Sequence, residues 1–330
     1  MTHHLIAISA LALTLFLSGC GEQASAPSSP EPEGESVMEA EFIADTPIQA
    51  VMDDPAFGDY GRLLFPMQTG YWSGDTLGSM RLTYYSHIDP NETVEIVNTL
   101  KERALAGETV FYDIYTDAEK AADPDKADTG LFFFKGEPGA RFAVCNAGGA
   151  FAYVGAMHDS FPHALELSQM GYNAFALIYR PGAQPACEDL ARAITFIFDH
   201  ADELQVDTNC YSLWGGSAGA RMAAWLGTYG PAAFGGDELP RPGAVIMQYT
   251  GLSEYAPDEP PTFACVGDSD GIAPWRVMEA RLDAMSACGI DTEFHCYPGL
   301  GHGFGLGTGT AAEGWLELAV RFWERQMQGN

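Results

Sequence analysis

The sequence predicts an α/β fold in which a mainly parallel central sheet has helices on both faces, with an N-terminal elaboration packed on the same core. Short apolar runs alternate with segments of helical periodicity from about Leu131, so residues 131–330 are predicted to form the sheet and its helices. Apolar runs without a polar face are typical of strands buried on both sides, as in a parallel sheet between helices. With 330 residues, of which 47% are hydrophobic, the chain can bury such a core.

Each strand is predicted from one apolar run. The runs are Leu131–Phe134, Phe142–Cys145, Ala174–Tyr179, Tyr211–Trp214, Ala244–Tyr249, Phe263–Val266 and Thr292–Tyr297. Apolar side chains at helical spacing predict helices over 190–204, 277–285 and 315–322. Arg180, just after a predicted strand, is expected in an ion pair at the edge of the core. In such a sheet, active sites gather at the carboxyl ends of the strands.

The segment 49–130 is predicted to be the N-terminal elaboration, because no Pro- or Ser-rich linker separates it from the core. Within it, Pro90 to Ala106 has a helical pattern, and Val110 to Tyr115 alternates like a half-buried strand. The pair Tyr71-Trp72 fits either packing against the core or the wall of a substrate cleft.

The first residues are predicted to direct export. Leu5 to Gly19 is an apolar run too short to cross about 30 Å of hydrocarbon, which takes roughly 20 helical residues. The run Leu17-Ser18-Gly19-Cys20 resembles the lipobox of bacterial lipoproteins, in which the cysteine is lipidated and begins the mature chain. Residues 1–19 are therefore predicted to be a lipoprotein signal peptide and Cys20 the lipidation site. A plainly cleaved signal is the alternative, because this region has no Lys or Arg.

Residues 20–48 are predicted to be a disordered, acidic, Pro/Ser-rich tether, because they are too polar and too rich in proline to build a core. Signal, cysteine and tether together predict an extracytoplasmic protein anchored to the membrane through the lipid on Cys20, at the cell surface or the periplasmic face.

The net charge and the spacing of cysteine and histidine argue against nucleic acid and metal ions as ligands. Sixteen basic and 45 acidic residues give a net charge of −29, which argues against nucleic acid as a partner. Neither C-x-x-C nor H-E-x-x-H spacing occurs, so no metal site is expected. Export permits disulfides among the six remaining cysteines, and the sequence leaves their state open.

Gly215-Gly216-Ser217-Ala218-Gly219 fits the G-x-S-x-G pattern. It lies between the predicted strand Tyr211–Trp214 and the segment Ala220 to Leu226, whose residues favour a helix. A serine on such a tight turn exposes its hydroxyl at the sheet end, with the helix N-terminus favouring developing negative charge. Ser217 is therefore the predicted nucleophile.

A serine hydroxyl needs a base, and His302 stands in Gly301-His302-Gly303 directly after the last predicted strand. An acid is needed to hold the imidazole, and either Asp268 or Asp270 follows the strand Phe263–Val266. Asp270 is preferred, because Asp268 abuts the strand end and is better placed for hydrogen bonds within the turn.

Acyl transfer also needs donors for the oxyanion. The small residues of Ala147-Gly148-Gly149-Ala150-Phe151 follow the strand Phe142–Cys145 and offer backbone N–H groups. Gly148, Gly149 and Ala150 are the candidate donors there, and the N–H of Ala218, the residue after the nucleophile, is the other.

These motifs resemble those of α/β-hydrolases of the acetyl-esterase and feruloyl-esterase-like kind, from about Leu131 to Met327. The resemblance rests on Ala147–Phe151, Gly215–Gly219, Gly267–Asp270 and His302-Gly303-Phe304. It implies an α/β-hydrolase fold, a triad of Ser217, Asp270 and His302, and an oxyanion hole of Gly149, Ala150 and Ala218. Asn146 and Ala147 stand where the family often has His-Gly, and Ala150 replaces its third glycine.

The sequence therefore predicts a serine hydrolase that needs no cofactor and cleaves carboxylic esters through an acyl-enzyme. Its substrate is expected to be a small-molecule or carbohydrate ester, since acyl groups on carbohydrates suit a surface location. Two alternatives stay open: a serine peptidase with the same triad, and a non-catalytic, ligand-binding surface lipoprotein.

Overall fold

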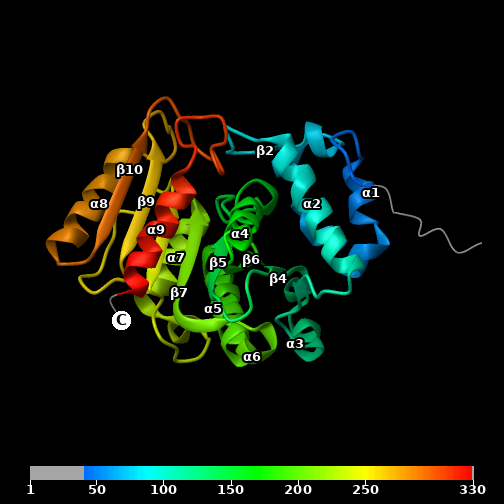
Figure 1. Cartoon of the computed structure of the whole chain (residues 1–330), viewed down its shortest axis with the longest axis horizontal. Coiled ribbons are helices and arrows are strands. Elements are labelled where there is room, and N and C mark those ends of the chain that lie inside the picture. The colour runs from blue at the N-terminus through cyan, green and yellow to red at the C-terminus, as the bar shows by residue number, and fades with distance from the viewer. Residues whose placement is uncertain (1–40, 329–330) are drawn as a thin grey trace, which may run out of the picture. The chain divides into compact units, whose positions relative to one another are not determined.

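The computed structural model describes residues 41–328, and Figure 1 shows their course. The predicted signal peptide and Cys20 lie outside the described residues. The helices are α1 (Ile48–Met52), α2 (Pro90–Leu105), α3 (Asp117–Ala122), α4 (Ser160–Gln169), α5 (Ala183–Asp199), α6 (Ala201–Leu204), α7 (Ala218–Tyr229), α8 (Trp275–Ala287) and α9 (Trp315–Met327). The strands are β1 (Trp72–Ser73), β2 (Arg81–Leu82), β3 (Phe111–Tyr112), β4 (Gly130–Phe134), β5 (Arg141–Asn146), β6 (Asn173–Ile178), β7 (Asp207–Gly216), β8 (Ala244–Gln248), β9 (Thr262–Gly267) and β10 (Thr292–Tyr297). None of the helices within residues 41–328 is long and apolar enough to span a membrane.

An eight-stranded sheet in the order β10-β9-β8-β7-β5-β6-β4-β3 forms the centre of the described chain. The seven apolar runs predicted as strands correspond to β4 through β10, so the mainly parallel sheet is confirmed. At one edge, however, β4 runs antiparallel to both β6 and β3. The apolar pattern does not specify this reversal, because a strand buried on both faces has the same unbroken pattern in either direction.

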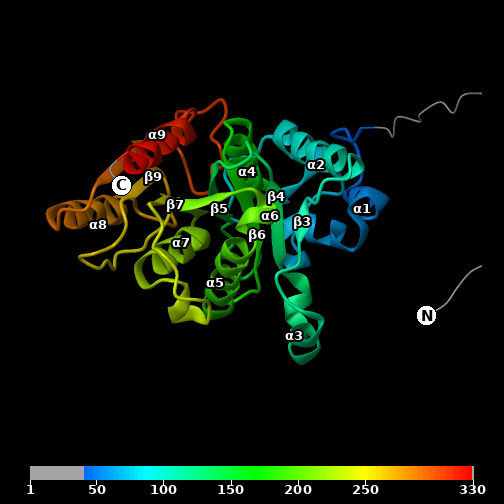
Figure 2. The ribbon, with the colours of Figure 1, turned by 60° about the horizontal axis from the view of Figure 1, so that its bottom comes forward.

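Helices cover both faces of this sheet, as predicted. Figure 2 shows α4 and α9 on one side of the strands and α5 and α7 on the other. The residues of β4, β6, β8 and β9 are buried throughout, whereas the edge strand β10 is partly exposed. The largest fully buried side chains of the core include Trp214, Trp315 and Trp323. This burial holds the strand ends, and the loops that follow them, in fixed positions.

The predicted tether is wrong at its C-terminal end, because residues 41–48 belong to the folded body. Phe42 is 7% exposed, stacks on Phe57 at 6.3 Å between ring centroids, and donates its backbone N–H to Asn98 Oδ1 at 2.8 Å. Ile48 is buried as the first residue of α1. Two large apolar side chains after the acidic stretch are enough to recruit this segment to the core.

Residues 49–130 pack on the same hydrophobic core as the sheet. Phe57 in the first segment and Ile96 and Leu100 on α2 are fully buried in one cluster with Phe132 of β4. The predicted strand over 110–115 is shorter than expected, since only β3 pairs with β4.

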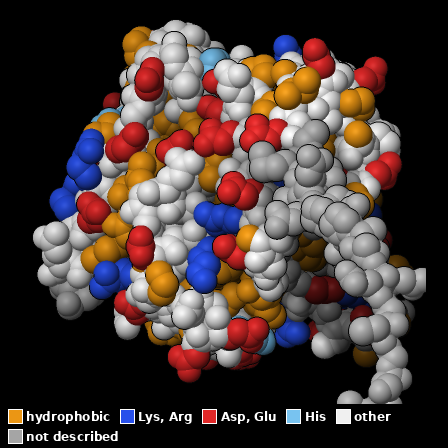
Figure 3. Space-filling view, turned by 45° about the vertical axis from the view of Figure 1, so that its right-hand side comes forward, with side chains coloured by type: hydrophobic (Ala, Val, Ile, Leu, Met, Phe, Trp, Pro, Cys, Tyr) orange, Lys and Arg blue, Asp and Glu red, His pale blue; other side chains and the backbone are white. Residues whose placement is uncertain are grey.

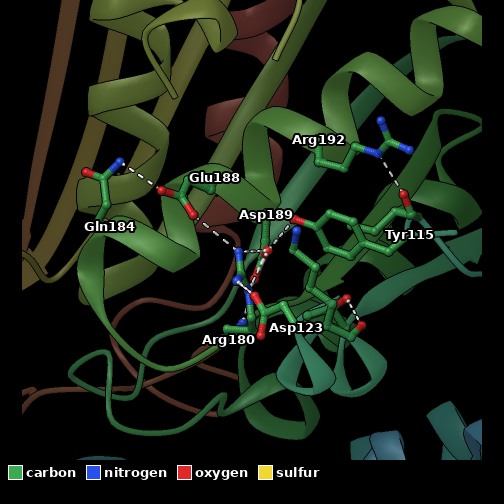
Figure 4. A network of polar contacts seen from close by, with 10 residues as sticks. Tyr115, Asp123, Arg180, Gln184, Glu188, Asp189 and Arg192 are labelled. Atoms are coloured by element: carbon green, nitrogen blue, oxygen red, sulfur yellow. Dashed lines mark hydrogen bonds and ion pairs between the residues drawn. The ribbon is translucent and has the colours of Figure 1, made fainter. Parts of the chain in front are cut away.

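Arg180 forms the expected ion pair at the edge of the core (Figure 4). Its guanidinium contacts the fully buried carboxylate of Asp189 on α5 at 2.8 Å and reaches Asp123, which follows α3, at 2.7 Å. Tyr115 also donates its hydroxyl to Asp189, at 2.6 Å. Because Tyr115 and Asp123 lie in the N-terminal segment, this network ties that segment to α5.

Candidate active site

Ser217 lies on a sharp turn between β7 and α7, in a strained backbone conformation with φ 51° and ψ −110°. Its own N–H donates to the carbonyl of Gln248 on the neighbouring strand β8, at 2.9 Å. A Cβ at Gly219 would lie only 2.0 Å from the carbonyl oxygen of Asn146, so this position in the motif has to be glycine. The small residues thus allow the tight turn that presents the serine hydroxyl.

The structure brings Ser217, His302 and Asp270 together at the carboxyl ends of the strands. His302 Nε2 lies 3.0 Å from Ser217 Oγ, and His302 Nδ1 lies 2.8 Å from Asp270 Oδ2. The other oxygen of Asp270 accepts the N–H groups of Ile272 and Ala273, at 2.8 and 2.7 Å. Such a chain can pass the serine proton to an imidazole that a fixed carboxylate orients.

The structure distinguishes the two candidate acids after β9. Asp268 Oδ1 accepts the backbone N–H of Gly299 at 2.7 Å and the hydroxyl of Ser269 at 2.9 Å, and the residue is exposed. Asp268 therefore holds the turn, and Asp270 is the carboxylate in contact with His302.

One predicted oxyanion donor is wrong. Gly148 donates its N–H to Asp159 Oδ2 at 2.7 Å, so this group is already occupied. Ala150 and Ala218 both line the cleft beside Ser217, and Ala218 is the first residue of α7. Gly149 forms the tight turn between Gly148 and Ala150, where its carbonyl accepts the N–H of Ala152 at 2.9 Å. Gly149, Ala150 and Ala218 therefore remain the candidate donors.

Sequence reasoning missed Asp159, a fully buried carboxylate behind the nucleophile. A Cβ at Gly216 would lie 2.4 Å from its Oδ2, which places the carboxylate against the serine turn. Tyr85 donates its hydroxyl to the same oxygen at 2.9 Å. Burial raises the pKa of Asp159 to about 6, although the hydrogen bonds from Gly148 and Tyr85 act in the opposite direction.

Two other buried histidines stand near this carboxylate and outside the triad. His163 Nδ1 lies 3.5 Å from Asp159 Oδ1, and His163 packs edge-on against Trp315. Burial lowers the pKa of both His158 and His163 to about 3, so both rings are neutral at ordinary pH. Nothing in the sequence distinguishes Asp159 from an ordinary helix-capping aspartate, since its role depends on distant neighbours.

The N-terminal segment also reaches the site. Ser86 donates its backbone N–H to the carbonyl of His302 at 2.9 Å, and Tyr153 donates its hydroxyl to the carbonyl of Thr83. Tyr71 stacks on Tyr153 at 5.0 Å and is absent from the lining of the cleft beside Ser217, which favours the packing role for that aromatic pair. Residues of this segment therefore support the loops that carry His302 and the oxyanion donors.

A cleft of about 390 Å³ opens beside Ser217 and His302. This volume suits a small substrate. Apolar side chains make up much of its wall, and Arg221 is the one Lys or Arg side chain in the lining. The lining residues are Ala150, Phe151, Ser217, Ala218, Arg221, Tyr249, Thr250, Gly251, Ile272, Ala273, Pro274, Val277 and His302.

Comparisons with known proteins agree with this geometry. The BD-FAE family model matches residues 137–238, which include the oxyanion loop and the serine turn. No curated protein sequence matches the chain significantly.

Solved structures with the same fold include several hydrolases. An acetyl ester-xyloside bifunctional hydrolase from Caldicellulosiruptor lactoaceticus is 20% identical, with a TM-score of 0.56 over 65% of this chain and 95% of that chain. An esterase from Thermogutta terrifontis in its propionate-bound form is 22% identical, with a TM-score of 0.55 over 65% of this chain and 93% of that one. The hydrolase MGS-M1 from a Medee basin deep-sea metagenome is 20% identical, with a TM-score of 0.52 over 61% of this chain and 93% of the other. The chain therefore has the α/β-hydrolase fold. Its serine turn, histidine loop and acid turn meet at the carboxyl ends of the parallel strands.

Proposed function

We propose that this protein is a serine esterase that hydrolyses carboxylic esters through an acyl-enzyme. The observation that carries the proposal is the hydrogen-bonded chain from Ser217 through His302 to Asp270 at the mouth of a small cleft. The BD-FAE match and the esterases among the structural neighbours favour an ester over a peptide bond.

In the proposed mechanism, Ser217 Oγ attacks the ester carbonyl carbon while His302 Nε2 takes the serine proton. The N–H group of Ala218 and that of Gly149 or Ala150 hold the oxyanion, and Asp270 stabilises the imidazolium. Collapse of the tetrahedral intermediate breaks the bond to the alcohol oxygen, which leaves with the proton from His302. A water molecule then attacks the acyl-enzyme by the same route and releases the acid and the free serine.

The test is hydrolysis of p-nitrophenyl esters from acetate to octanoate, beside aminoacyl p-nitroanilides as peptide-like substrates. The proposal expects turnover of esters by the parent, loss of that turnover in Ser217→Ala, and slow or undetectable release from the anilides. Faster cleavage of the anilides would favour the peptidase. Inactivity on every substrate would favour the ligand-binding alternative.

We also propose that the enzyme is exported and anchored to a membrane through a lipid on Cys20, with small-molecule or carbohydrate esters as its substrates. The lipobox-like run before Cys20 supports the anchor, and a neighbour named as an acetyl ester-xyloside hydrolase supports the carbohydrate ester. Incorporation of labelled palmitate into the parent and its absence in Cys20→Ser tests the anchor. Release of acetate from acetylated xylo-oligosaccharides tests the substrate.

A further inference from the structure

Arg221 lies in the first turns of α7, four residues after Ser217. Ser217 is the N-cap of this helix, and the backbone N–H of Arg221 donates to the Ser217 carbonyl at 3.4 Å. Both residues line the same cleft, and Gly251 is part of the same lining. Arg221 therefore lies in the same cleft as the serine that attacks the substrate.

Arg221 has no charged partner within the part of the chain that the structure describes. Among residues 41–328, no carboxylate forms an ion pair or hydrogen bond with it, and the cleft lining holds no Asp or Glu. By contrast, Arg180 and Arg281 both pair with buried carboxylates. Arg103, Arg276 and Arg321 also form no ion pair among the described residues, and Arg221 differs from them because its side chain lines the cleft that holds Ser217 and His302.

The rest of the molecule does not attract anions. Acidic side chains are scattered over the face shown in Figure 3, and the chain carries a net charge of −29. The long-range field therefore repels an anionic substrate, and only a short-range contact in the cleft can hold one. Apolar neighbours such as Phe151 and Val277 lower the local polarity and strengthen a charged hydrogen bond there.

We propose that Arg221 binds a carboxylate of the substrate, so that the enzyme prefers esters that carry a second, free carboxylate. A guanidinium matches a carboxylate in shape and donates two parallel hydrogen bonds to it. The carboxylate can belong to the acyl part, as in a half-ester of a dicarboxylic acid, or to the alcohol part. This inference rests on the proposed esterase function, and Arg221 acts in it as a specificity residue that takes no part in proton transfer.

The test compares matched substrates that differ in one charge. On the acyl side, the p-nitrophenyl half-ester of glutarate is compared with p-nitrophenyl pentanoate. On the alcohol side, 4-acetoxybenzoate is compared with 4-acetoxybenzamide. Each pair is measured with the parent, Arg221→Gln, Arg221→Lys and, as a matched control, Arg321→Gln, whose exposed side chain on α9 is absent from the cleft lining.

The inference expects Arg221→Gln to lose about 10- to 100-fold in kcat/KM on the anionic member of one pair, mainly through KM, and to keep its rate on the neutral member. Arg221→Lys should retain part of the preference, and Arg321→Gln all of it. The pair that responds identifies the side of the ester that carries the carboxylate. Equal losses on both members, or no preference in the parent, would overturn the inference and leave the esterase proposal standing.

A binding measurement separates this failure from failure of the esterase proposal itself. Calorimetric titration of Ser217→Ala with glutarate and with 4-hydroxybenzoate needs no turnover. If either anion binds to Ser217→Ala but not to the double variant that also carries Arg221→Gln, the result would support the anion site even in a protein that cleaves no ester. Absence of binding at millimolar concentration, in a protein without charge preference, would overturn it.

Discussion

Asp159 offers a test of whether the buried surroundings of the nucleophile are as the structure describes them. Its carboxylate is fully buried, and one oxygen, Oδ2, accepts both the Gly148 N–H and the Tyr85 hydroxyl. The substitution Asp159→Asn keeps the shape of the side chain and an oxygen for these two donors, and it removes the negative charge.

The expected size of the effect follows from the pKa. Burial raises the pKa of Asp159 from 3.8 to about 6, so the Asp159 carboxyl group holds its proton more tightly in the folded protein than in the unfolded chain. The free energy of unfolding therefore falls as the pH rises from about 4 to about 6, and the full cost is present above pH 6. Two pKa units correspond to about 3 kcal/mol, and about half of this cost is already present at pH 5.

Urea unfolding of the parent and of Asp159→Asn at pH 5 and pH 8 measures this cost. The variant should be more stable than the parent by up to about 3 kcal/mol at pH 8, and the gain should shrink to about half at pH 5. Asp59→Asn, which alters an exposed carboxylate, serves as the control and should show no such pH-dependent gain. A variant that is less stable than the parent at pH 8, or a gain that does not depend on pH, would refute the reasoning.

Two further pairs of substitutions test the acid turn and the core. Asp270→Asn should lower kcat on esters by at least about 100-fold, because the imidazole loses the carboxylate that orients it. Asp268→Asn should change kcat by less than about threefold. Similar losses in both variants would contradict the assignment of Asp270 as the triad acid. Arg281→Met should lower the free energy of unfolding by about 3 to 5 kcal/mol, because it leaves Glu259 buried without its cationic partner, and Glu259→Gln added to it should recover part of that loss in the same urea titration.

The sheet could be predicted well from the sequence, because each of its central strands is a local apolar run and several of these runs are separated by segments of helical periodicity. The direction of β4 could not, since it depends on which edge of the sheet the strand joins. The end of the tether could not be predicted because Phe42 and Ile48 lie in a short segment without helical or strand periodicity, and their burial depends on α2 and on the segment after α1.

The same distinction applies to the site. Ser217, His302 and Asp270 each follow a strand in a recognisable local motif, so they could be proposed from spacing alone. The occupied N–H of Gly148 could not be foreseen, because its acceptor comes from the start of α4 and is held by Tyr85, far earlier in the chain. Arg221 could be recognised as a candidate specificity residue only once the lining of the cleft was known, because the sequence does not show whether its guanidinium has a carboxylate partner.

The most direct test of the central claim is covalent trapping of the nucleophile. The purified protein is treated with a p-nitrophenyl phosphonate ester, and the intact mass, the modified peptide and the residual hydrolysis of p-nitrophenyl acetate are followed together. We expect one adduct per chain on Ser217, loss of hydrolysis in proportion to labelling, and no adduct in Ser217→Ala. Labelling at another residue, or hydrolysis that persists when Ser217 is fully modified, would contradict it.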